Sequence, residues 1–151
     1  MKFKKYSIIA VVVLLLLFSF YIALRGIHTP APTQPNGPTI SIPTSQGSVQ
    51  VPDVTQNPVF QTIDTYDFKK SDQYEIVYFS QEKSFTITIL APPAQQSRDA
   101  AEQAFLDTLA ISKADACKLS VSLTVPYDVD PTLAGKDYGL SFCPSGSQFG
   151  Q

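Results

Sequence analysis

The chain has no tryptophan, one histidine and only two cysteines among its 151 residues. A serine or cysteine nucleophile activated by histidine needs the imidazole within hydrogen-bond reach. His28 follows an apolar N-terminal stretch and lies far along the chain from any candidate nucleophile. Cys117 and Cys143 have neither nearby histidines nor CxxC spacing, so no metal site is expected. A glycine-rich phosphate loop is also missing, and no cofactor is expected.

Basic residues are scarce beyond residue 28. That part of the chain contains seven Lys and Arg residues and all thirteen Asp and Glu residues. Its net charge is therefore 7 − 13 = −6. Such a field repels a polyphosphate, so nucleic acid is not an expected partner.

One long apolar run stands out near the start. Ser7 to Leu24 has no Asp, Glu, Lys, Arg or His, and at about 1.5 Å per residue a helix of this length reaches roughly 27 Å. Lys2, Lys4 and Lys5 precede the run and Arg25 follows it, which predicts a cytoplasmic N-terminus. The sequence therefore predicts a single-pass anchor in the lipid bilayer (residues 1–28), with the rest of the chain extracytoplasmic. A cleaved signal peptide and a buried soluble helix are the alternatives.

A proline-rich segment follows from Thr29 to Gln61. It holds seven of the twelve prolines and one charge, Asp53, so we expect a spacer without regular structure. Ile40–Ile42 and Val49–Val51 alternate briefly, which leaves room for one short edge strand.

Residues 62–145 are expected to fold as a small α+β domain, with 146–151 as a flexible tail. Apolar residues alternate with polar ones in four stretches, a pattern typical of half-buried strands: residues 74–79, 85–90, 119–125 and 138–142. Between the second and third stretches, Ala101, Phe105 and Leu109 recur at helical spacing, and Ser97 is expected to cap that helix. The order ββαββ predicts two layers, one main helix packed on about four antiparallel strands.

The strand pattern assigns hydroxyl side chains to the sheet face opposite the helix: Thr86, Thr88, Ser120, Ser122, Thr124 and Ser141. A glycan, a partner or solvent would meet this face. A disulfide is expected between Cys117 and Cys143, because an oxidising compartment and a small core both favour it. The bridge requires Cys117 to lie in a helical turn before the third strand, or a twist at that strand's end.

Three segments carry a resemblance to a family of uncharacterised bacterial membrane-anchored proteins. They are Ala101–Leu106, Ile111-Ser112 followed by Ala116-Cys117, and the AGKDYGLSFC segment from Ala134 to Cys143, under a third of the chain. The resemblance implies no activity. Ala110 stands where the family would have glycine, which predicts a less sharp helix end.

Candidate catalytic residues remain few. Glu75, Glu82 and Glu102 are the carboxylates considered for glycoside cleavage, and Ser112 with Lys113 for a Ser-Lys pair. Asp128, Asp130 and Asp137 lack calcium-loop spacing, since Leu133 takes the glycine position. The sequence thus favours an anchored binding or structural module that contacts an envelope protein or surface polymer. A carboxylate-based envelope hydrolase and a pilin-like assembly subunit are the alternatives.

Overall fold

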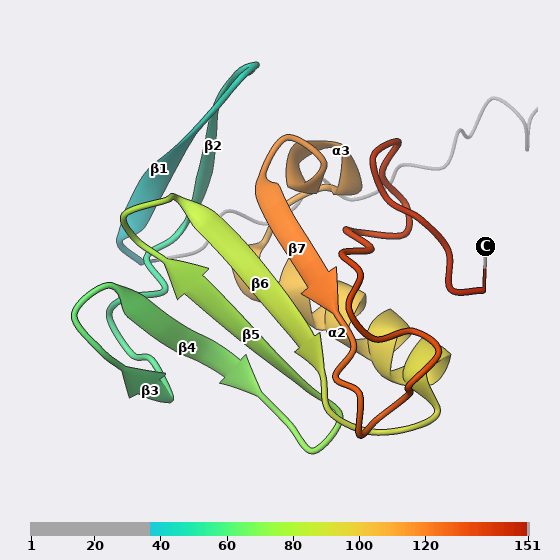
Figure 1. The fold of residues 1–151 in the computed structure, drawn as a ribbon. Helices are drawn as coiled ribbons and strands as arrows, with labels where there is room; N and C mark the ends of the chain where they lie inside the picture. Colours follow the sequence, from blue (N-terminus) through green and yellow to red (C-terminus); the bar gives the residue numbers. More distant parts are fainter. Residues whose placement is uncertain (1–36, 151) are drawn as a thin grey trace, which may run out of the picture. The chain divides into compact units, whose positions relative to one another are not determined.

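The computed structural model describes residues 37–150. These residues form an α+β domain with two sheets and one main helix (Figure 1). The strands are β1 (Thr39–Thr44), β2 (Gly47–Pro52), β3 (Phe60–Gln61), β4 (Thr65–Lys70), β5 (Tyr74–Phe79), β6 (Ser84–Ile89) and β7 (Ser120–Thr124). The helices are α2 (Ala94–Leu109) and the short α3 (Lys113–Ala116). The predicted anchor Ser7–Leu24, His28 and the start of the expected spacer lie outside the described residues.

The centre of the larger sheet follows the predicted alternation. β5 and β6 pair antiparallel, with Ile76 opposite Ile87 and Tyr78 opposite Phe85 on the buried face. Side chains of successive strand residues point to opposite faces, so Val77 and Thr86 lie together on the other face. Figure 1 shows α2 behind the sheet, so one face packs on the helix and the other is not covered by it.

The last strand corrects the predicted topology. The strand order is β3-β4-β5-β6-β7, and β7 runs parallel to β6 rather than antiparallel. A parallel partner needs a crossover, and α2 with α3 provides it. β3 and β4 are additional strands that the sequence analysis missed.

Helix α2 buries the predicted stripe of Ala101, Phe105 and Leu109 against the sheet. The prediction that Ser97 caps this helix is wrong, because Pro93 is the N-cap. Ser97 lies inside the helix, where its hydroxyl donates to the carbonyl of Ala91 at 2.7 Å. The prediction of a less sharp helix end at Ala110 is also wrong. Ala110 adopts a left-handed conformation, φ 50°, and its amide closes the last turn.

Part of the expected spacer is folded. β1 and β2 form an antiparallel hairpin within the range predicted to be unstructured, and its residues Ile42, Val49 and Val51 belong to the core. Both strands of a two-stranded sheet are edge strands. Pro43 and Pro52, which have no N–H to donate, are therefore tolerated in them. The expectation of a spacer up to Gln61 is therefore wrong from Thr39 onward.

The C-terminal segment, residues 137–149, is not a strand followed by a tail. Tyr138 donates its amide to Leu123 of β7 at 2.8 Å, and the Leu123 amide donates to the Asp137 carboxylate at 2.9 Å. Gly139 has a positive φ of 56°, which ends any strand at this point. The segment thus covers the free edge of β7, where an open strand would invite pairing with another chain. The expected strand at 138–142 is wrong.

Residues up to 150 are also not a free tail. Ser147 donates its amide to Tyr138, and the Phe149 ring lies edge-on to the Tyr138 ring at 4.7 Å. Within residues 37–150, no helix is both long and apolar enough to cross a bilayer.

Candidate functional site

The three glutamates considered for glycoside cleavage do not meet. Glu75 lies on β5, Glu82 is exposed in the turn after it, and Glu102 is buried on α2. Retaining and inverting glycosidases both need two carboxyls on either side of one bond. The structure therefore gives this set no shared site.

The Ser-Lys candidate has a structural explanation. The Ser112 hydroxyl caps α3 by accepting from the Asp115 amide at 3.1 Å, and it donates to the Asp115 carboxylate. The Ser112 hydroxyl is thus engaged in helix capping. Asp130 and Asp137 likewise accept hydrogen bonds from backbone amides, so these two members of the acidic cluster stabilise the local backbone.

Helix α2 carries a buried ion pair that the sequence analysis missed. Arg98 is 0% exposed and Glu102 5% exposed, and their side chains meet at 2.9 Å one helical turn apart. The guanidinium also donates to the carbonyl of Gly139 at 3.0 Å, while the Glu102 carboxylate accepts from the Ser141 amide at 2.7 Å. The pair thus fastens the C-terminal segment to α2.

Aromatic rings close over this pair. The Arg98 guanidinium lies 4.5 Å from the Phe149 ring centroid and 5.8 Å from that of Tyr138. Arginine over an aromatic face is attracted by the ring quadrupole, more strongly when water is excluded. The i, i+4 spacing of Arg98 and Glu102 is the only sequence signal that pointed to this pair.

A second titratable cluster lies on the sheet face away from α2. Asp67 of β4 is 5% exposed, and its Oδ1 has no hydrogen-bond partner among the described residues. Burial raises the pKa of the Asp67 carboxyl, and the neighbouring Glu75 carboxyl raises it further. A hydrogen bond from Lys70 at 2.5 Å lowers the pKa of Glu75. Asp67 is therefore the group that takes up a proton as the pH falls.

Asp67→Asn is expected to stabilise the domain at neutral pH by about 1 kcal/mol, since it removes a buried charge beside Glu75. A raised folded-state pKa means that the contribution of Asp67 is fully present below its ordinary value of 3.8 and is lost as the pH rises through the raised value. The gain should thus shrink on acidification and vanish below that ordinary value. Urea unfolding across this pH range measures it, with Asp72→Asn as the exposed control; a gain independent of pH would contradict the assignment.

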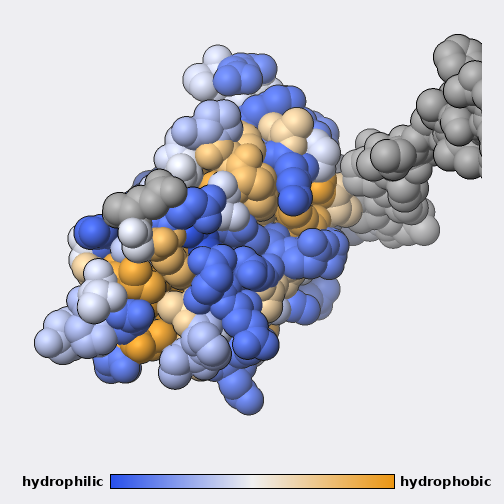
Figure 2. Space-filling view, turned by 90° about the vertical axis from the view of Figure 1, so that its right-hand side faces the viewer, coloured by the Kyte–Doolittle hydropathy of each residue, from blue (hydrophilic) through white to orange (hydrophobic). Residues whose placement is uncertain are grey.

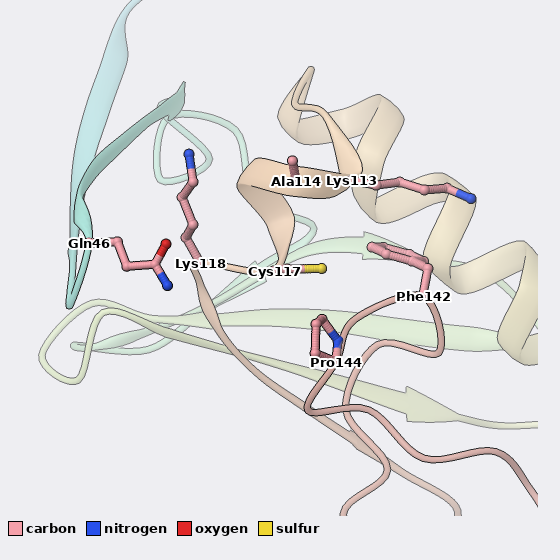
Figure 3. A pocket seen from close by; sticks show the side chains of 7 residues that line it. All are labelled: Gln46, Lys113, Ala114, Cys117, Lys118, Phe142 and Pro144. Carbon is pink, nitrogen blue, oxygen red and sulfur yellow. The ribbon is translucent and has the colours of Figure 1, made fainter.

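A surface hollow of about 410 Å³ lies between three separate parts of the fold (Figure 3). The β1–β2 turn, α3 with the residues after it, and the C-terminal segment line it: Gln46, Lys113, Ala114, Cys117, Lys118, Phe142 and Pro144. The disulfide between Cys117 and Cys143, with Cα atoms 5.4 Å apart, joins two of these parts. Cys117 is the C-cap of α3, which is the helical turn that the predicted bridge required.

Two lysines give this hollow its charge. Figure 3 shows Lys113 and Lys118 pointing in different directions from the α3 region. The Lys113 ammonium lies 5.0 Å from the Phe142 ring centroid, and Lys118 contacts Asp115 at 2.6 Å. None of the described residues that line the hollow is Asp or Glu. It is thus a cationic, partly aromatic site on a domain whose net charge is negative.

A smaller hollow of about 210 Å³ adjoins it. Lys113 and Phe142 line both, and the smaller one adds Asp99, Glu102, Gln103, Leu106 and Ser141. Its charged residues have both signs, so the smaller hollow is mixed in charge although it shares Lys113 with the larger one. On the side where the C-terminal segment lies, hydrophilic residues dominate, with hydrophobic residues in smaller patches between them (Figure 2).

The predicted hydroxyl face is partly present. Thr86 lies opposite Ser122, Thr88 opposite Thr124 and Ser84 opposite Ser120, all on the sheet face away from α2. Ser141 does not belong to it, because residue 141 lies in the C-terminal segment and donates its hydroxyl to Glu102. This face consists of neighbouring strands, whereas the hollow is lined by three separate parts of the fold.

Comparisons with protein-family models, curated proteins and solved structures find no match for this chain.

Proposed function

We propose that this protein is a membrane-anchored extracytoplasmic binding module, and that the cationic hollow of Figure 3 is its ligand site. The hollow carries the proposal, because chain segments from residues 46, 113–118 and 142–144 converge on it. A site whose walls come from distant segments depends on the whole fold, as binding sites commonly do.

The anchor and the disulfide support the location. The uncharged run Ser7–Leu24 is long enough to span a bilayer, and the lysines before it favour a cytoplasmic N-terminus. Cys117 and Cys143 lie at disulfide distance, which fits an oxidising compartment outside the cytoplasm. Binding is favoured over catalysis because the hollow brings two cations and an aromatic ring together, while the nearest carboxylates and hydroxyl are engaged in structural contacts: Asp115 with Ser112 and Lys118, and Glu102 with Arg98 and Ser141.

Photocrosslinking in intact cells tests the proposal. A photoreactive residue replaces Gln46 in the full-length chain, and a matched variant carries it at Glu82 in the exposed turn after β5. We expect a slower-migrating adduct from position 46 and none from position 82. Equal adducts from both positions, or none from position 46, would contradict a ligand site in the hollow.

A further inference from the structure

The cations of the hollow lie apart rather than side by side. Lys118 extends on the side of Gln46, whereas Lys113 extends over Phe142 (Figure 3). A single small anion would contact only one of them. Two separated ammonium groups instead suit a ligand that carries repeated negative charges along its length.

The lining between the lysines is mostly apolar. Phe142, Pro144, Ala114 and Cys117 line it, and the Gln46 amide offers a donor and an acceptor. A sugar ring presents C–H groups to an aromatic face and hydroxyls to an amide. Lysine binds carboxylates as a point charge without requiring planar, bidentate geometry.

The protein itself offers poor occupants. A second copy would bring a net charge of −6 from residues 29–151, but that charge is spread over a folded surface rather than along a chain. The proline-rich segment of this chain before residue 37 contains no Asp or Glu. The net charge of −6 repels a long polyanion, whereas the lining of the hollow carries two lysines and no carboxylate. Charge complementarity within the hollow therefore favours a short acidic segment of an external ligand.

We infer that the hollow binds an acidic saccharide, whose carboxylates meet Lys113 and Lys118 and whose sugar ring stacks on Phe142; this rests on the proposed function of the hollow. The Lys118 charge is partly neutralised by Asp115, so Lys113 contributes more to affinity. Exposed charges are screened, so binding weakens as the salt concentration rises.

Titration calorimetry tests this with the full-length chain in neutral phosphatidylcholine nanodiscs. The probes are tetragalacturonate, the uncharged cellotetraose and the acidic peptide tetraglutamate. We expect tetragalacturonate to bind at least about tenfold tighter than either control, and Lys113→Gln to weaken it about fivefold, which corresponds to about 1 kcal/mol. Lys136→Gln, a charge change outside the hollow, should have no effect, and Lys113→Arg should retain binding.

The controls separate the alternatives. Equal binding of tetraglutamate would show a site for any acidic chain, and equal binding of cellotetraose would show that the lysines do not take part; either result overturns the inference. Phe142→Tyr keeps the aromatic ring and should keep the affinity, whereas Phe142→Leu should lose affinity. The thermal unfolding midpoint of each variant checks that it is folded. A Gln46 photoadduct without tetragalacturonate binding would overturn the saccharide class and leave the binding site standing.

Discussion

Glu102→Ala is expected to lower the free energy of unfolding by about 3–5 kcal/mol, the cost of leaving one partner of a buried ion pair alone. The substitution strands the Arg98 guanidinium, which is 0% exposed and whose Nη1 already has no hydrogen-bond partner within residues 37–150. It also removes the acceptor of the Ser141 amide and hydroxyl. Urea unfolding of the full-length chain in detergent micelles measures the loss.

Two variants make this result specific. Glu82→Ala removes an exposed glutamate and should change stability by less than about 0.5 kcal/mol. Arg98→Met combined with Glu102→Leu removes both charges and should recover part of the loss, because no charge is left buried. A loss below about 1 kcal/mol for Glu102→Ala would contradict the role of the pair.

The effect should also be local. The pair holds residues 139 and 141, so amide hydrogen exchange in the C-terminal segment should speed up more than exchange in β5 and β6. A uniform increase across the sheet would instead indicate that α2 itself had lost its packing.

Regular alternation made the central strands predictable. β5, β6 and β7 each present apolar residues with a period of two, and the sequence signal places them within one or two residues. Their pairing direction was not predictable in this way, because alternation is the same in parallel and antiparallel strands. The hairpin β1–β2 was hidden by its composition, since Pro43 and Pro52 are tolerated only where a strand has a free edge.

The candidate site was less predictable than the fold. Arg98 counts as one more surface cation in the sequence, and only its contacts with Gly139 and Phe149, about 40 to 50 residues further on, show that it is buried. The hollow depends in the same way on Gln46, Lys113 and Phe142 meeting across the chain. Cysteine pairing was the exception, because the chain offers only one possible partner for each.

Removing both cysteines, Cys117→Ala with Cys143→Ala, is expected to cost about 3.5 kcal/mol in the chain-entropy model. The two residues are 26 apart, and the bridge limits the unfolded chain across β7 and the turn after it. Thermal and urea unfolding of the variant should match those of the wild-type chain under reduction. Reductant should not affect the double variant, and equal stability of oxidised wild type and variant would contradict this role.

The bridge and the Arg98–Glu102 pair hold the same segment, so their losses should not add. Without the bridge, residues 139–147 detach more readily and the Glu102 and Arg98 side chains reach water in the opened state. Glu102→Ala should therefore cost less in the cysteine-free chain than in the wild type. Strict additivity would show that the disulfide and the ion pair act on independent parts of the domain.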